Sequence, residues 1–167
     1  MLLGAKPQPT PALEALLGKT HEQLSQKLCS DPQGLTKLRT DPNNGHPVEL
    51  WRCHGFRSAL APDSALTLYF EDGKVALAMA TAGAKDAAEA TSSFDAAAAK
   101  LRKLACQKRE DRELSVAVQD CKDGPKFEVL THVTMPDPDQ PDGHRHGLVL
   151  QATTDPGTAQ RLGKLFH

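Results

Sequence analysis

The chain has 167 residues, a formal net charge of -1 at pH 7, and few aromatic side chains: one Trp, one Tyr and five Phe. This length fits one ordinary domain or two small, closely packed ones, with a core built mainly from Leu, Val and Ala. The balanced charge argues against a nucleic-acid-binding protein, which would carry a basic stripe. No run of about 18 apolar residues is present, so we expect no membrane span.

The first nine residues are interpreted as a flexible lead-in. Residues 1–5 are too short to be a signal peptide, and residues 6–9 contain two prolines. If the protein is exported, we expect its signal to have been removed. The lead-in would then fit a tether to a removed N-terminal anchor, as in a lipoprotein.

Helical signals follow up to the first cysteine. Thr10-Pro11 is typical of a helix start, and Gly18 can end that helix. Thr20 followed by Gln23 forms a capping-box pattern that starts a second helix, which we expect to continue to Cys29. The sequence therefore predicts two short helices.

Three strands are predicted next. Residues 48–53 favour a strand. Leu66, Leu68 and Phe70 alternate along a second strand, and Val75, Leu77 and Met79 alternate along a third. Asp72-Gly73 between the last two is typical of a tight hairpin turn.

The second half has a similar order. Ser92 and Asp95 indicate a helix start, and apolar residues then recur at helical spacing up to Cys106. The basic clusters at residues 100–103 and 108–112 are interpreted as the polar face and the end of this helix. Three more strands are predicted at residues 114–118, 127–133 and 148–152, and Asp155-Pro156 begins a short terminal helix.

This order predicts an α+β protein, an antiparallel sheet with helices packed on one face. We divide the chain into residues 10–83 and 84–167, which share the order of their elements. One hypothesis is a tandem helix-plus-three-strand duplication. The alternative is a single antiparallel sheet whose helices alternate with strand triplets.

The four cysteines occupy matching places in the two halves. Cys29 and Cys106 each end a predicted helix. Cys53 lies in the first strand-like run after its helix, and Cys121 ends the first strand-like run after the other. An even number of cysteines in a small chain suggests disulfides Cys29–Cys53 and Cys106–Cys121. Such pairs predict a periplasmic or secreted location.

The first half also carries short motifs in a recognisable order. They are Leu17-Gly18-Lys19-Thr20, Gln23-Leu24, Leu28, Pro32, Glu49-Leu50-Trp51, residues 66–70 and Asp72-Gly73-Lys74-Val75. Together they resemble the helical entry, the tryptophan strand and the final hairpin of the BamE/SmpA-OmlA family, which shares its fold with the β-lactamase inhibitory protein. The resemblance covers residues 13–79. It departs from the family at Cys29 and Ser30, where Gly is usual, and the second half has no comparable entry motif.

The resemblance implies an extracytoplasmic helix-plus-sheet module that binds other proteins, in outer-membrane assembly or in inhibition of a secreted enzyme. It transfers no catalytic residue. By analogy with that fold, the concave face of the sheet and the loops at residues 39–46 and 136–146 would form the binding surface.

Trp51 is the candidate contact residue. If its face is exposed beside Arg52, Phe56 and Arg57, these four would form a binding hot spot, because Trp and Arg are enriched at such positions. The alternative, which the usual burial of tryptophan favours, is that Trp51 belongs to the core.

The loop at residues 137–146 is the candidate metal site. It holds Asp137, Asp139, Asp142, His144 and His146, and we single out Asp142, His144 and His146 because imidazole suits Zn or Cu. However, persuasive zinc motifs draw their ligands from two ordered elements, and these residues crowd one loop. An ordinary solvated hairpin loop is the favoured interpretation.

No residue set indicates a reaction. Cys53 and His54 are neighbours in a predicted strand and would point to opposite faces, and His132 is interpreted as a surface or sheet-packing side chain. No nucleophile elbow, P-loop, dinucleotide fingerprint or HExxH motif is present. We therefore predict no enzyme activity and no cofactor.

The function predicted is that of an inhibitor or immunity protein against a secreted enzyme or toxin, with an envelope-assembly factor or a metal- or small-ligand-binding protein as alternatives.

Overall fold

A computed structural model describes residues 13–24, 26–101, 108–112, 115–120, 126–155 and 157–166, and only the backbone of residues 108–112, 115–120 and 126. The strands are β1 Thr36–Asp41, β2 Val48–Phe56, β3 Ser64–Glu71, β4 Lys74–Ala84, β5 Lys108–Arg112, β6 Ser115–Asp120, β7 Lys126–Pro136 and β8 His144–Thr153. The α-helices are α1 Ala87–Leu101 and α2 Thr158–Gly163, and the 3-10 turns are η1 Leu13–Leu16, η2 His21–Gln23, η3 Asn43–Gly45 and η4 Lys164–Phe166.

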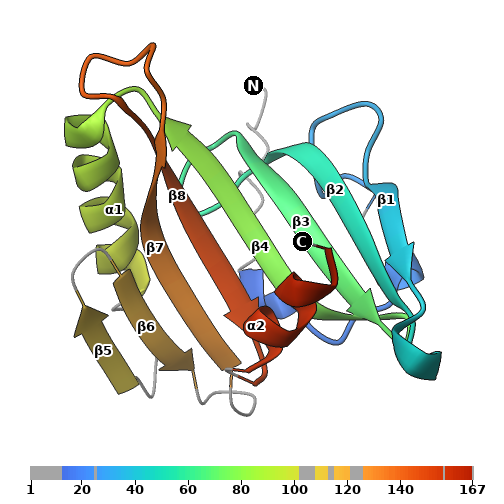
Figure 1. Ribbon diagram of the computed structural model, residues 1–167. Coiled ribbons are helices and arrows are strands. Elements are labelled where there is room, and N and C mark those ends of the chain that lie inside the picture. Colours follow the sequence, from blue (N-terminus) through green and yellow to red (C-terminus); the bar gives the residue numbers. More distant parts are fainter. Residues whose placement is uncertain are drawn as a thin grey trace, which may run out of the picture.

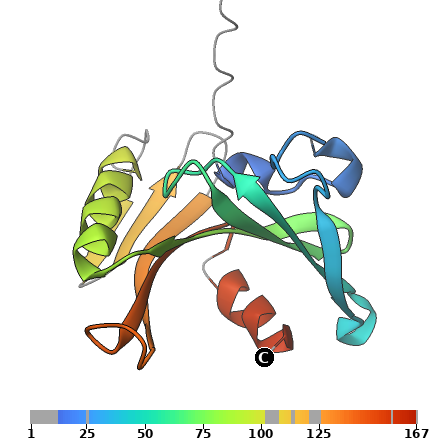
Figure 2. The same ribbon diagram turned by 90° about the horizontal axis from the view of Figure 1, so that it is seen from above.

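The described strands form one antiparallel sheet of eight strands in the order β1-β2-β3-β4-β8-β7-β6-β5 (Figure 1). β1–β4 form one meander and β5–β8 a second, and the two join where β4 pairs with β8. The sheet curves into an arch. We call the side that carries α1, η1 and η2 the convex face and the side that carries α2 the concave face (Figure 2).

The predicted fold class, an α+β protein with helices on one face of the sheet, is wrong. The sheet dominates the described chain, each meander has four strands instead of three, and α1 and α2 lie on opposite faces (Figure 2). The predicted boundary between residues 83 and 84 stays a prediction.

The N-terminal helices are also replaced by shorter elements. Leu13 and Leu16 are both buried, and their spacing of three residues suits a 3-10 turn as well as an α-helix. Gly18 then takes a positive φ of 78°, which interrupts any helix. The predicted capping contact does form, because the Thr20 N–H donates to Gln23 Oε1 at 2.9 Å, but it begins only the single turn η2.

The hairpin of β3 and β4 confirms the strongest strand prediction. Asp72 and Gly73 both take positive φ values, 52° and 79°, as a two-residue hairpin turn requires. In β3 the alternating residues Leu66, Leu68 and Phe70 are buried on the convex side, as the sequence predicts. In β4 the pairing with β3 shifts register beside the turn, so Val75 packs on the convex side and Leu77 on the concave side. The predicted common face of Val75, Leu77 and Met79 is therefore wrong.

Two strands, β1 and β5, were not predicted, and both lie at the edges of the sheet. β5 is the sequence Lys-Arg-Glu-Asp-Arg, interpreted above as the end of a helix, and most of β1 is exposed. Edge strands often carry charges because these discourage pairing with other molecules. Such strands lack the apolar alternation that would reveal them.

Helix α1 begins five residues before the predicted Ser92. The Glu89 N–H donates to Asp86 Oδ1 at 2.8 Å, and Glu89 Oε2 accepts the Lys85 N–H at 2.6 Å. These reciprocal contacts satisfy backbone donors at the helix start, so the cap lies at Asp86.

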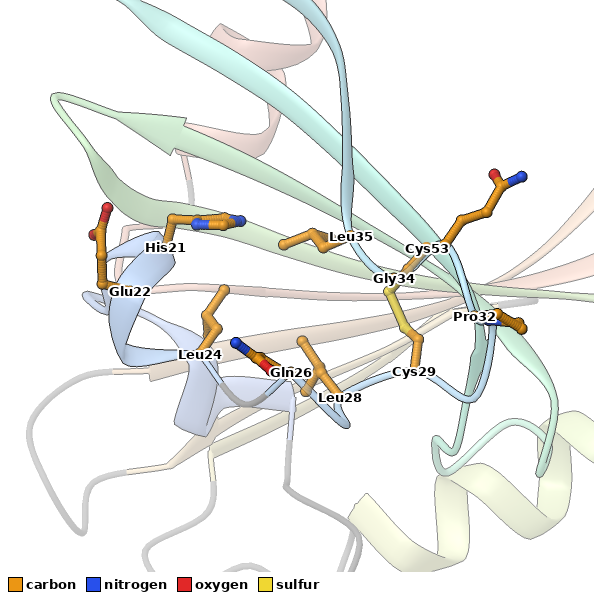
Figure 3. Close-up of a pocket in the computed structure, with 11 residues that line it drawn as sticks. His21, Glu22, Leu24, Gln26, Leu28, Cys29, Pro32, Gly34, Leu35 and Cys53 are labelled. Carbon is orange, nitrogen blue, oxygen red and sulfur yellow. A yellow bond between two sulfur atoms is a disulfide. The ribbon is translucent and has the colours of Figure 1, made fainter.

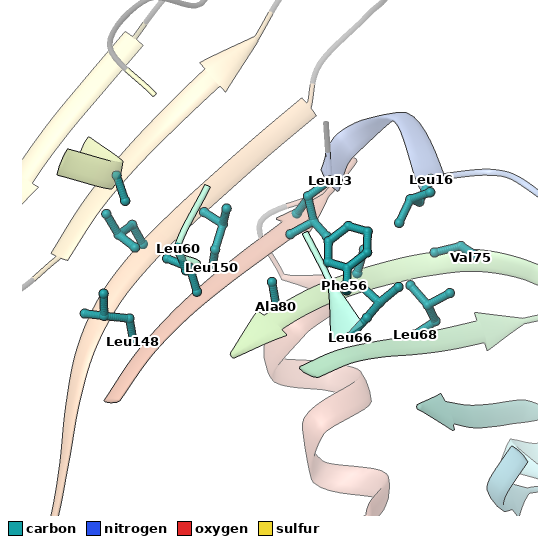
Figure 4. Packing of buried hydrophobic residues seen from close by; sticks show 14 of the residues in the cluster. Leu13, Leu16, Phe56, Leu60, Leu66, Leu68, Val75, Ala80, Leu148 and Leu150 are labelled. Carbon is teal, nitrogen blue, oxygen red and sulfur yellow. The ribbon is translucent and has the colours of Figure 1, made fainter. Parts of the chain in front are cut away.

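The main core lies on the convex face, between the sheet and the elements η1 and α1. Figure 4 shows the leucines of η1 lying over side chains of β2, β3 and β4, among them Phe56, Leu66, Leu68 and Ala80. A smaller cluster on the concave face joins Leu162 of α2 to Val48 and Leu77. The single buried leucine of α2 thus attaches it to the sheet.

Candidate functional site

The concave face is only partly covered by the chain itself. α2 and η4 pack over the part formed by β2, β3 and β4, where Ala159, Leu165 and Phe166 surround Leu162. Thr153 of β8 is buried on this face, where α2 also contacts β8, but seven other side chains of β7 and β8 on this face are half-buried or exposed. They are Phe127, Val129, Thr131, Val133 and Met135 of β7 with Val149 and Gln151 of β8. Met135 is 56 % exposed. We call these seven residues the open strip.

Two loops border this face. η3 and the tip of the β7–β8 hairpin lie at the two ends of the arch, on the same side as α2 (Figure 2). In the first loop, the Asn43 N–H donates to Asp41 Oδ1 at 2.8 Å, and Asn43 and Asn44 take positive φ values. This Asx contact and the left-handed asparagines define a tight turn.

The hairpin loop is held by its acidic first residue. Asp137 Oδ2 accepts hydrogen bonds from Arg145 Nε and Nη2 at 3.2 and 3.0 Å, and Asp137 Oδ1 accepts the Asp139 N–H at 3.1 Å. The backbone contact from Asp139 and the Arg145 guanidinium hold the pKa of Asp137 below its ordinary value. Both loops are therefore shaped by contacts within themselves before any partner binds.

A positively charged corner lies at the other end of the face, beside η4. Arg39 Nη1 donates to the Phe166 carbonyl at 3.5 Å, and Arg52 Nε donates to Thr67 Oγ1 at 3.3 Å. Among the described side chains, neither guanidinium has a carboxylate within ion-pair distance. Burial raises the pKa of the nearby Tyr69 hydroxyl, and the charge of Arg52 partly offsets that rise. This corner offers two cations to a negatively charged group.

The four predicted contact residues do not share one surface. The Trp51 ring lies 4.4 Å from the His21 ring and 6.0 Å from Phe70 on the convex side, and Phe56 is buried in the core. Arg52, next to Trp51 in β2, faces the concave side. Trp51 and Arg52 point to opposite faces because side chains alternate along a strand. A register shift between Cys53 and Phe56 then lets both of these residues be buried.

Arg57 lies just beyond the end of β2 and is exposed. Of the four predicted residues, therefore, Arg52 is the one that lies on the concave face. Arg39, which stands beside it there, is the first residue of the predicted binding loop 39–46, but it belongs to β1, which was not predicted as a strand.

The first predicted disulfide is present. Cys29 and Cys53 are bonded, with their Cα atoms 6.1 Å apart, and the bond fastens the segment at Cys29 to β2. A cavity of about 610 Å³ adjoins the bond, with Leu24, Leu28 and Leu35 around it and His21 at the opposite end (Figure 3). Cys106 and Cys121 lie outside the described residues. A disulfide is compatible with an extracytoplasmic location.

The Asp and His residues of the hairpin form a hydrogen-bonded chain. His146 is buried, and its Nε2 donates to Asp142 Oδ2 at 2.6 Å. His146 Nδ1 lies 3.1 Å from Nε2 of His132 on the neighbouring strand. The contacts of Asp142 with His146 and with the His144 backbone lower its pKa, whereas burial, with a smaller effect of His146, lowers the pKa of His132.

The metal ligands predicted from the sequence are not assembled. His144 Nδ1 lies 3.0 Å from the backbone oxygen of Asp142, while the Asp142 carboxylate contacts His146. No group of three or more His, Cys, Asp or Glu side chains in the described part of the chain is arranged to hold a metal ion. His132 was interpreted from the sequence as a surface or sheet-packing side chain and was not paired with His146. The β7–β8 register, which brings it near His146, could have been counted from the hairpin turn.

Comparisons with known proteins leave this geometry as the only guide. No protein-family model, no curated protein and no solved structure matches the chain. The resemblance to the BamE/SmpA-OmlA family therefore stays a prediction. Among the residues that the structure describes, no helix is long and apolar enough to cross a membrane.

Proposed function

We propose that this protein is a non-enzymatic, extracytoplasmic binding module that holds a partner protein against its concave face. In this proposal it acts as an inhibitor or immunity protein against a secreted enzyme or toxin. The observation that carries the proposal is the open strip, a row of half-buried and exposed side chains on the face that α2 leaves uncovered.

The chemistry of the face suggests the chemistry of the partner. The open strip is neutral and mostly apolar, whereas Arg39 and Arg52 supply positive charge at the other end. Complementary surfaces pair opposite charges and bury apolar centres. We therefore expect a protein whose contact surface has apolar side chains beside carboxylates.

Gly83 provides a way to block this face without disturbing the fold. It is exposed, lies opposite Gly147 at the edge of the open strip, and a Cβ built on it meets no atom within 4 Å. The variant Gly83→Arg should therefore fold normally and place a long side chain where the partner would sit. Ala99→Arg, at an exposed position of α1 on the convex face, is the matched control.

The experiment begins with capture by the immobilised wild-type protein from envelope and culture-supernatant extracts, followed by purification of the retained protein. Its affinity is then measured by calorimetry for all three forms. We expect Gly83→Arg to bind at least about tenfold more weakly, equivalent to about 1.4 kcal/mol, and Ala99→Arg to bind like the wild type. Equal affinities for the wild type and Gly83→Arg would rule out the concave face.

A charge variant tests the expected acidity of the partner. Arg52→Glu should weaken binding and reduce its dependence on salt, because rim charges act mainly on association. An unchanged salt dependence would contradict an acidic partner surface. A tight one-to-one complex would support an inhibitor or immunity protein, whereas weak binding within a larger assembly would instead favour an envelope-assembly factor.

A further inference from the structure

We infer that His132 and His146 form a two-imidazole site for one divalent metal ion of the Cu²⁺ or Zn²⁺ class. The site is independent of the proposed function, because His146 lies on the same face of β8 as the core leucines Leu148 and Leu150, on the convex side of the sheet. It also differs from the set predicted from the sequence, since it draws its ligands from two neighbouring strands.

The spacing of the two rings suits a shared ion. His132 Nε2 and His146 Nδ1 are 3.1 Å apart, and the ring centroids are 5.3 Å apart. Two nitrogens that bind one tetrahedral Zn²⁺ at about 2.0–2.1 Å lie roughly 3.3 Å from each other. An ion could therefore replace the hydrogen bond between the rings with a shift of a few tenths of an ångström.

Asp142 supplies the outer contact that metal-binding histidines usually have. Its Oδ2 accepts the Nε2–H of His146 at 2.6 Å, so the Nδ1 lone pair of that ring faces His132. A carboxylate behind a ligating imidazole fixes its orientation and raises its basicity. In this inference Asp142, predicted from the sequence as a metal ligand, instead orients the ligand His146.

Metal binding here needs no net loss of protons when both rings are neutral. His146 keeps its Nε2 proton, which is hydrogen-bonded to Asp142, and offers Nδ1 to the ion. His132 moves its proton from Nε2 to Nδ1 and offers Nε2. The change is one of tautomer, so the ion adds its charge without an oxidant, a reductant or a leaving group.

Space for water ligands exists beside His146. His146 lines a cavity of about 500 Å³ together with Glu89, Gln140 and Arg145. The His144 ring is 6.5 Å from that of His146, and its Nδ1 lies 3.0 Å from a backbone oxygen, so it does not complete the site. The ion would keep water in its remaining positions, and Cu²⁺ should bind more tightly than Zn²⁺.

The test uses the untagged full-length protein, ZnCl₂ as the NMR probe and CuCl₂ in calorimetry. We expect Zn²⁺ to shift the imidazole resonances of His132 and His146 in a saturable, one-to-one manner, and His132→Gln to abolish both that shift and Cu²⁺ binding. His144→Gln is the matched control and should bind as the wild type does. Absence of any shift at 1:1 and at excess Zn²⁺, or loss of binding in His144→Gln but not in His132→Gln, would overturn the site.

Asp142→Asn gives a second, independent measure. The Asp142 side chain is exposed, so the substitution should leave the far-UV circular dichroism spectrum unchanged. The same spectrum checks that His132→Gln is folded. Loss of the carboxylate behind His146 should weaken metal binding by about 10-fold or more. An unchanged affinity would show that Asp142 does not support a metal ligand and would overturn that part of the inference.

Discussion

Removal of the Cys29–Cys53 disulfide tests how the N-terminal segment is held on the sheet. The two cysteines are 24 residues apart, and a cross-link that closes a loop of this length lowers the entropy of the unfolded chain. The loop-closure relation gives a stabilisation of about 3.5 kcal/mol at 25 °C. For a chain of this size, such a loss corresponds to a fall in Tm of roughly 7–14 °C.

The assay is urea unfolding of the double variant Cys29→Ala/Cys53→Ala, which leaves Cys106 and Cys121 in place. Wild type with thiols blocked after full reduction is the companion sample, because it lacks every disulfide. If the double variant lost less than about 1 kcal/mol in its free energy of unfolding, the reasoning would be refuted. The unfolded chain would then gain little conformational freedom when the bond is removed. Peptide mapping of the oxidised protein must first identify the bonded pair.

Three further predictions concern packing, backbone and charge. Leu66→Ala, at a fully buried position, should lower the free energy of unfolding by about 2–5 kcal/mol in urea titrations, whereas Leu38→Ala at a half-exposed position should change it by less than about 0.5 kcal/mol. Gly55→Ala should cost about 1–3 kcal/mol in the same assay, because φ is +76° and a Cβ would lie 2.0 Å from a neighbouring side-chain oxygen; the open position Gly83 gives the control Gly83→Ala, expected to be near neutral. The pKa of Asp137 is lower in the folded protein, so its carboxylate stabilises the fold above pH about 4 and that stabilisation is lost as the pH falls further. The Tm of Asp137→Asn should therefore lie below that of the wild type at pH 7 and approach it as the pH falls below about 4, and a constant difference would contradict this assignment.

Much of the sheet could be predicted because its central strands are buried on alternate residues. Strands β3 and β8 show this alternation, and Asp72-Gly73 supplies the turn between β3 and β4. The edge strands β1 and β5 could not be found in the same way. Among the described strands, each pairs with a neighbour on one side only, and their charged residues resemble a loop or the end of a helix.

The placement of the candidate sites shows a similar division. Trp51 and Arg52 are neighbours in the sequence, yet the strand points them to opposite faces, and only the packing of α1 and α2 decides what each face becomes. The open strip depends on where the short helix α2 comes to rest. That position results from the burial of Leu162 against two strands, which its own sequence does not reveal.

By itself, the sequence determined the local features that neighbouring residues control, namely the hairpin turn and the alternation of strands such as β3 and β8. The number and placement of the cysteines also predicted the pairing of Cys29 with Cys53, although these two are 24 residues apart. Tertiary structure alone decided the features that join distant residues. The β4–β8 pairing makes one arch of two meanders, and the β7–β8 register brings His132 within hydrogen-bonding distance of His146. The physical reason is that turns and alternation follow from backbone geometry within a few residues, whereas the curvature of the sheet, the choice of face and the register follow from packing of the whole chain.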